Sequence, residues 1–96
     1  MLARVISSQG PVGQVDQIER YLQDQLIPSV KGTPGFVAGY WLGDRQTGKG
    51  LTITVWDSEA ALQASGPQAN PSTMQALQAL GVTLTGVERY EVLGQA

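Results

Sequence analysis

The sequence predicts an α+β domain of the ferredoxin-like type, with the element order β-α-β-β-α-β and a four-stranded antiparallel sheet. A length of 96 residues suits one domain with a modest core, so we take residues 1–96 as a single domain. Runs rich in β-branched residues alternate with stretches of helical spacing. Two halves, each a strand, a helix and a strand, meet at a polar loop near Arg45. Right-handed crossovers then place both helical regions on one face of the sheet.

The first half supplies a strand, a long helix and a second strand. Residues 2–7 are rich in Val and Ile and precede a Gly- and Pro-containing break, which predicts the first strand. Over residues 14–30 apolar side chains recur at helical spacing, and Pro28 is expected to kink or loosen the last turn. A Pro-Gly turn then leads into the second strand, residues 36–42.

The second half begins with a hairpin. Residues 43–50, GDRQTGKG, are polar and Gly-rich and predict the loop between the second strand and a third strand at 51–56. Asp57 or Ser58 is expected to cap the helix that follows directly.

That helix is predicted to break at Gly66 and Pro67. It restarts with Asn70 as N-cap and Pro71 at the first helical position, and Gly81 ends it. The last strand is predicted at residues 87–93.

Composition and charge exclude several classes of function. Six basic residues against eight acidic ones give a net charge of −2, which argues against a nucleic-acid partner. The chain has no apolar run of about 18 residues, so we expect no membrane span. The N-terminus lacks the apolar core of a signal peptide, and the absence of Cys agrees with the cytoplasmic location that we expect.

The residues that are missing also restrict the chemistry. The chain has no His and no Cys, which excludes Ser-His triads, thiol nucleophiles, His/Cys zinc clusters and haem held by a proximal His. We therefore expect no metal and no cofactor. Proton transfer would have to use carboxylates, Tyr, Lys or water.

Both faces of the predicted sheet are partly apolar, although the helices can cover only one. In the third strand Leu51, Ile53 and Val55 oppose Thr52, Thr54 and Trp56. A solvated second face would alternate more steadily with polar residues. We therefore expect a homodimer in which a second copy covers the open face.

Trp56 is the main pocket candidate, because it stands where a strand turns directly into a helix. Its alternative role is to fill the core at that corner. Phe36 and Tyr40 share its face if Leu42 faces Gly50 across the hairpin, and Tyr40 could then orient a substrate hydroxyl. A slip of one residue would bring in a different set instead: Val37, Gly39 and Trp41.

Arg4 and Arg89 are expected to be neighbours, because the first and last strands pair in this fold. Two guanidinium groups there could hold an anionic or carbonyl-bearing ligand. The alternative, which we favour from the sequence, is that they pair with Glu88 or Glu91. Asn70 could contact a ligand at the pocket mouth, although its role as N-cap is a sufficient explanation.

The segment at residues 34–64 carries a family likeness. It reads PGFVAGYW, a hairpin, and then LTITVWDSEAALQA. It resembles the antibiotic biosynthesis monooxygenase-like domains of the dimeric α/β-barrel superfamily, in which Pro-Gly-Phe opens the second strand and the third ends in Trp-Glu-Ser-Glu-Ala or a near variant. Residues 56–60 read WDSEA here, and the element order agrees over nearly the whole chain.

This resemblance implies two protomers packed sheet to sheet, each with a pocket between its sheet and its helices. Some members of the family oxidise aromatic polyketides with molecular oxygen and without metal or flavin. Others degrade haem with a Trp at the position of Trp56, an Asn on the first strand and a haem-ligating His. This chain has the Trp, but it has Ser7 and Ser8 where the Asn would fall, and no His. The resemblance therefore does not extend to haem degradation by that route.

Two functions of different kinds remain open from the sequence. One is a cofactor-independent, monooxygenase-like enzyme acting on a small aromatic or quinol-type substrate. The other is a module of the same fold without catalysis, which binds a small apolar or aromatic molecule or acts as a dimeric interaction unit.

Overall fold

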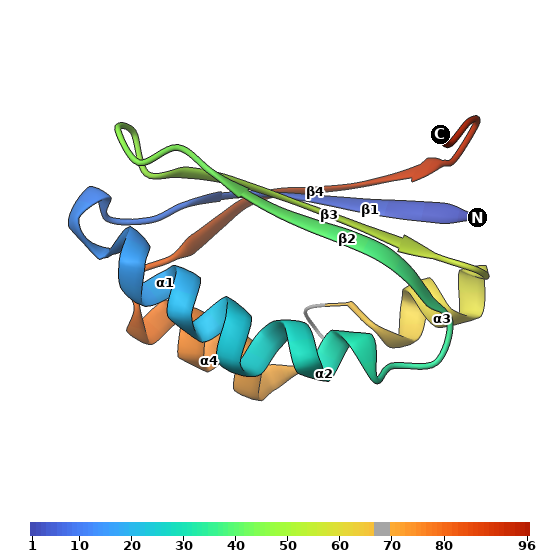
Figure 1. Ribbon diagram of the computed structural model, residues 1–96, viewed down its shortest axis with the longest axis horizontal. Coiled ribbons are helices and arrows are strands. Elements are labelled where there is room, and N and C mark those ends of the chain that lie inside the picture. Colours follow the sequence, from blue (N-terminus) through green and yellow to red (C-terminus); the bar gives the residue numbers. More distant parts are fainter. Residues whose placement is uncertain (67–69) are drawn as a thin grey trace.

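The computed structural model describes residues 1–66 and 70–96, and it has the expected ferredoxin-like fold. Its four strands form one antiparallel sheet in the order β2-β3-β1-β4, and the helices all lie against one face of it (Figure 1). The opposite face of the sheet is open. In the described part of the chain, no helix is long and apolar enough to cross a membrane.

Strand β1, Leu2–Gln9, is central in the sheet, and it is followed by one long helical segment. That segment begins with a 3-10 turn at Val12–Gln14 and continues as α1, Val15–Tyr21. A π-helical stretch, Leu22–Leu26, then leads into α2, Ile27–Lys31. The expected disturbance at Pro28 thus takes the form of a widened turn just before it. Proline has no N–H to donate to the residue four positions earlier, and a π turn accommodates this missing bond.

Strands β2, Phe36–Gly43, and β3, Lys49–Trp56, form the predicted hairpin. Its loop is tighter than the sequence indicated, because Asp44 and Gly48 close it. The Gly48 N–H donates to the Asp44 carbonyl at 2.8 Å, and the Asp44 N–H donates to the Lys49 carbonyl at 2.8 Å. Gly48 has φ +78°, which a residue with a Cβ rarely adopts.

Helix α3, Glu59–Ala64, follows β3 with only two residues between them. Ser58, one of the two predicted caps, accepts the Ala61 N–H through its Oγ at 3.2 Å. Helix α4, Pro71–Ala79, starts at the predicted position, and Gly81 follows its end at φ +83°. The predicted break at Pro67 lies outside the described residues.

Strand β4 is Thr83–Glu91, so it begins four residues earlier than residues 87–93 of the sequence-based prediction. Its first part pairs with β1 because the register shifts between Ser7 and Ser8, which lets the strand continue through Gly86. An interior glycine weakens the strand pattern in the sequence, and here the next residue toward the start of the strand, Thr85 of β4, is the extra residue of a bulge.

Candidate functional site

The two segments of the family motif meet at one corner of the fold. The Asp57 N–H donates to the Gly35 carbonyl at 2.9 Å, and the Phe36 and Trp56 rings meet edge to face with centroids 5.5 Å apart. Gly35 has φ +87°, and a Cβ there would lie 2.4 Å from that of Ala61. The Pro-Gly-Phe turn and the WDSEA corner therefore form one packed unit that joins β2, β3 and α3.

Trp56 is 2% exposed, and its Nε1–H donates to Thr54 Oγ1 at 3.0 Å. Leu62 of α3 is also buried, at 3% exposed. This end of the domain is packed. Trp56 closes that packed end and also lines the hollow next to it.

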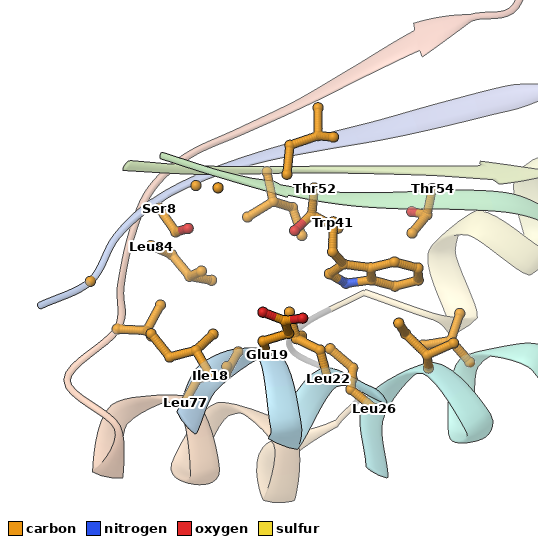
Figure 2. A pocket seen from close by; sticks show the side chains of 18 of the residues that line it. Ser8, Ile18, Glu19, Leu22, Leu26, Trp41, Thr52, Thr54, Leu77 and Leu84 are labelled. Atoms are coloured by element: carbon orange, nitrogen blue, oxygen red, sulfur yellow. The ribbon is translucent and has the colours of Figure 1, made fainter. Parts of the chain in front are cut away.

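The other end of the space between sheet and helices is a cavity of about 430 Å³. Figure 2 shows it between the strands and α1, with the Trp41 indole inside it. The helical wall is apolar, and its side chains are only half-buried because they face the hollow rather than the sheet: Ile18, Leu22, Leu26, Met74 and Leu77. The volume lies in the range of pockets that hold small molecules, about 300–1,000 Å³.

The cavity exists because the sheet presents small side chains to the helices. Strand register places Ser8 opposite Gly50, and Gly50 opposite Gly43. The next rows toward the packed end include Thr52 and Thr54. Among the described residues, the larger side chains that the sheet adds to this lining include Ile6, Trp41 and Leu84, and they leave the gap between the layers open. The sheet wall therefore combines hydroxyl groups with apolar side chains, whereas the helical wall is mostly apolar.

The structure corrects the position of Tyr40. Leu42 pairs with Leu51, not with Gly50 as assumed for the candidate set, and Tyr40 is 63% exposed on the open face. Trp41 points to the helices instead and lines the cavity. Phe36 remains on the Trp56 side because a bulge between Phe36 and Ala38 reverses the alternation of β2. The sequence contains no signal for this bulge, so it could not decide between Tyr40 and Trp41.

Trp41 lies flat over its own strand. A Cβ at Gly39 would be 2.8 Å from Trp41 Cη2 and 2.9 Å from Cζ3. Gly39 is opposite Thr54, so the indole covers a position where the sheet has no side chain. The missing Cβ makes room for the ring, which then presents its other face to the cavity.

Arg4 lines the cavity at its packed end and is 8% exposed. Its Nη1 donates to Ser65 Oγ at 3.1 Å, and its Nη2 donates to the Leu62 carbonyl. Burial, and to a lesser extent the charge of Arg89, lower the pKa of Arg4. Arg4 thus caps the last turn of α3, where carbonyl groups favour a cation.

Arg89 of β4 is opposite Arg4 of β1, as we predicted from the pairing of the first and last strands. The expected pairing of these arginines with Glu88 or Glu91 is wrong. Arg89 pairs with Glu59 in the first turn of α3 at 3.1 Å. Alternation along the strand points Glu88 to the opposite face, where it accepts a hydrogen bond from Tyr90 instead.

Asn70 is at the N-cap of α4 and also lines the cavity. Among the described residues its side chain makes no capping hydrogen bond to that helix, which differs from the capping role inferred from the sequence. Its amide group therefore borders the cavity without a capping hydrogen bond to the helix.

The hairpin loop closes the far end of the cavity. Arg45 forms ion pairs with Asp16 at 2.6 Å and Glu19 at 2.7 Å, so the loop is tied to α1. The hydrogen bond and charge of Asp16, supported by Glu19, raise the pKa of Arg45. In the described residues no group of three or more His, Cys, Asp and Glu side chains is arranged to hold a metal ion.

No protein-family model matches the sequence. Two uncharacterized proteins of Mycobacterium tuberculosis strains are each 30% identical over 71 residues, which is 74% of this chain and 32% of the relative. The chain thus spans about a third of the length of the curated relatives it matches.

Solved structures with very different sequences share the fold. HapK from Hahella chejuensis has a TM-score of 0.81 at 17% identity, and the match covers 100% of this chain and 96% of that one. SnoaB, a cofactor-independent oxygenase from Streptomyces nogalater, has a TM-score of 0.70 at 19% identity, covering 98% and 94%. The heme-degrader MhuD from Mycobacterium tuberculosis, solved with two hemes in its active site, has a TM-score of 0.73 at 20% identity, covering 100% and 99%. The chain has the fold of the antibiotic biosynthesis monooxygenase-like proteins.

Proposed function

We propose that this chain binds a small planar aromatic molecule in the cavity between sheet and helices, and that it positions this molecule for oxidation by molecular oxygen. The observation that carries the proposal is the Trp41 indole, which presents a ring face inside a cavity of about 430 Å³. Trp56 borders the same space. Aromatic rings stack favourably on such a surface, by about 0.5–1.5 kcal/mol beyond the area they bury.

The chemistry would come from the substrate. An anthrone-type molecule that loses a proton from its reactive CH₂ carbon has an electron pair that can reduce oxygen. One oxygen atom would remain on that carbon as a carbonyl group, and the other would leave as water with the two hydrogens of the former CH₂ group. The protein would contribute orientation and an apolar helical wall that excludes water.

SnoaB, which has the same fold, is described as a cofactor-independent oxygenase. This supports the proposal without identifying the substrate, because one fold can carry several activities. Oxygen-electrode assays with anthrone and with hydroquinones test it. We expect protein-dependent oxygen uptake that falls at least tenfold in Trp41→Phe or Trp56→Phe. Tyr40→Phe, on the opposite face of the sheet, is the matched control and should retain the wild-type rate. No uptake across the panel would refute the enzymatic part.

A second candidate function is binding without turnover. Both carboxylates that line the cavity already have partners: Glu19 pairs with Arg45, and Asp44 Oδ1 accepts the Gln46 N–H at 2.8 Å. A general base is therefore not evident in the cavity. Thermal-shift screening with aromatic compounds distinguishes the two functions, since ligands that raise the Tm but are recovered unchanged in air would support binding alone.

We also propose that a second copy covers the open face of the sheet. Apolar side chains on that face include Tyr40, 63% exposed, and Leu42, 52% exposed. A stable interface of standard size buries about 1,600 Å² in total, which the open face of a four-stranded sheet can supply.

A further inference from the structure

The cavity contains a buried positive charge whose partners in the described residues are neutral. Arg4 is 8% exposed, and its guanidinium donates to the Ser65 hydroxyl and the Leu62 carbonyl. No carboxylate forms an ion pair with it among the described residues. Residues 67–69 read PQA and have no ionisable side chain, so they cannot supply one.

The surroundings do not balance this charge. The carbonyl end of a helix contributes at most about half of a negative charge. The cation opposite Arg4 is Arg89, whose own carboxylate partner is Glu59 at 3.1 Å. Burying a charge without a counter-charge is unfavourable, so the Arg4 end of the cavity is a place where an anion would be stabilised.

There is also room for an anion beside Arg4. The cavity lining beside Arg4 includes Ser65 and Gly66. A Cβ added at Gly66 would lie 3.4 Å from Arg4 Nη2, so the glycine keeps the side of the guanidinium open. A guanidinium has five N–H donors in a planar fork that matches the two oxygens of a carboxylate.

The register of the strands relates this corner to the aromatic wall. Arg4 is opposite Thr54, and Thr54 is opposite Gly39, over which the Trp41 ring lies. Two strand spacings separate the backbones of β1 and β2, which is about 10 Å. A fused aromatic ring system with an acidic group at one end has a matching length.

We propose that Arg4 is the anion-binding group of the cavity, so that the ligand is a planar aromatic molecule with an anionic oxygen, either a carboxylate or an ionised phenol. This inference rests on the proposed function in one respect, namely that the cavity holds an aromatic ligand. Arg4 would bind the anionic oxygen at the packed end while the ring lies against Trp41.

A matched pair of probes tests the proposal on the wild-type protein. Naphthalene-2-carboxylate and naphthalene-2-carboxamide have nearly the same shape, and only the first is an anion. We expect the carboxylate to bind at least tenfold more tightly, measured by calorimetry at neutral pH. In protein labelled with ¹⁵N-arginine, the carboxylate should shift the Arg4 Nε–H resonance, whereas the carboxamide should leave it nearly in place.

Variants separate Arg4 from the general charge of the protein. In Arg4→Gln the preference for the carboxylate should fall below threefold, and in the matched control Arg89→Gln it should persist. Because Arg4 also caps α3, the glutamine variant could fail to fold, and the resonance shift in the wild-type protein then decides the question.

Three outcomes would overturn the proposal. Equal affinity for the two probes would refute the anion site and leave the aromatic pocket standing. A preference retained in Arg4→Gln would place the anion elsewhere. Absence of binding by both probes would overturn the proposed function, and the anion site with it.

Discussion

The Phe36 ring meets the Trp56 indole edge to face, with centroids 5.5 Å apart and planes inclined by 73°. This contact joins the first residue of β2 to the last residue of β3, next to the Gly35–Asp57 hydrogen bond. Two sequence segments about twenty residues apart are thus one structural unit. At this packed corner, side-chain and backbone contacts hold the sheet and the helices together. The two layers can therefore remain separated at the cavity next to it.

Loss of the Phe36 ring should weaken this corner. In Phe36→Leu we expect the free energy of unfolding to fall by about 0.5–1.5 kcal/mol, because the ring contact is lost while an apolar side chain remains. Urea unfolding followed by circular dichroism measures this. Val12→Ala, at a site that is 53% exposed, is the control and should change stability by less than about 0.5 kcal/mol. Equal stability of Phe36→Leu and wild type would show that the ring contact contributes little.

A methyl group at Gly39 should displace the Trp41 ring. The new Cβ would approach Trp41 Cη2 to 2.8 Å, so in Gly39→Ala we expect the indole to swing into the cavity and ligand affinity to fall at least fivefold. The Trp41 indole N–H resonance should shift. Gly13→Ala, in the 3-10 turn after β1, is the control, because no heavy atom of the described residues lies within 4 Å of its Cβ and it is not among the residues that line the cavity. An unchanged Trp41 resonance in Gly39→Ala would contradict the stacked arrangement.

The ion pairs of Arg45 should hold the hairpin loop against α1. These groups are exposed, so salt should screen them and their effect on global stability should be small. In Arg45→Gln we expect faster amide hydrogen exchange in the loop, at Gly48 in particular, at low ionic strength. In high salt, the amide hydrogen exchange rate of the wild-type loop should rise toward that of the variant, because salt screens the ion pairs. Arg20→Gln, on the same helix, should exchange as the wild type does at both salt concentrations.

The phenol of Tyr90 should titrate above the usual tyrosine pKa. Tyr90 donates a hydrogen bond to Glu88 at 2.6 Å, and this bond, with the carboxylate charge, raises the pKa of Tyr90. The stabilisation is complete below the pKa of the unfolded chain, about 10, and is lost as the pH rises through the folded value. Near-ultraviolet absorbance of tyrosinate follows the titration. Glu88→Gln should return the pKa of Tyr90 toward 10, and no change would show that the bond is not formed in solution.

A charge on the open face should separate the proposed dimer. Tyr40→Asp places an unpaired carboxylate where the second copy would pack, which is costly at an apolar interface. We expect light scattering after gel filtration to give twice the 10.2 kDa chain mass for the wild type and a single chain for the variant. Val12→Asp, in the 3-10 turn after β1, should remain dimeric. A wild-type protein that is monomeric at micromolar concentration would refute the dimer.

The element order and most element boundaries could be predicted from the sequence, because they depend on local signals. Ser58, Pro71 and Gly81 define helix ends through capping and backbone geometry that a single residue type determines. The beginning of β4 could not be predicted in the same way. Its first residues pair after a shift in the register between β1 and β4, which is a property of two strands at once.

The cavity was only partly predictable for a similar reason. Trp56 and Arg4 lie on its border. The choice between Tyr40 and Trp41 depended on a bulge near Val37, and a shift of one residue exchanges the two faces of a strand. The partners of Arg4 and Arg89 come from α3, whose placement over the sheet is a tertiary feature.

The glycine opposite Gly50 gives this cavity an adjustable length. At Gly43 the nearest atom to a new Cβ is 4.0 Å away, whereas at Gly50 the Ser8 hydroxyl oxygen would be 2.5 Å away. Replacing Gly43 by Ala, Val and then Phe would shorten the accessible space from the hairpin end in steps, without touching Arg4 or Trp56. Such replacements are expected to favour progressively smaller ligands, and this position offers protein engineers a simple means of changing ligand size.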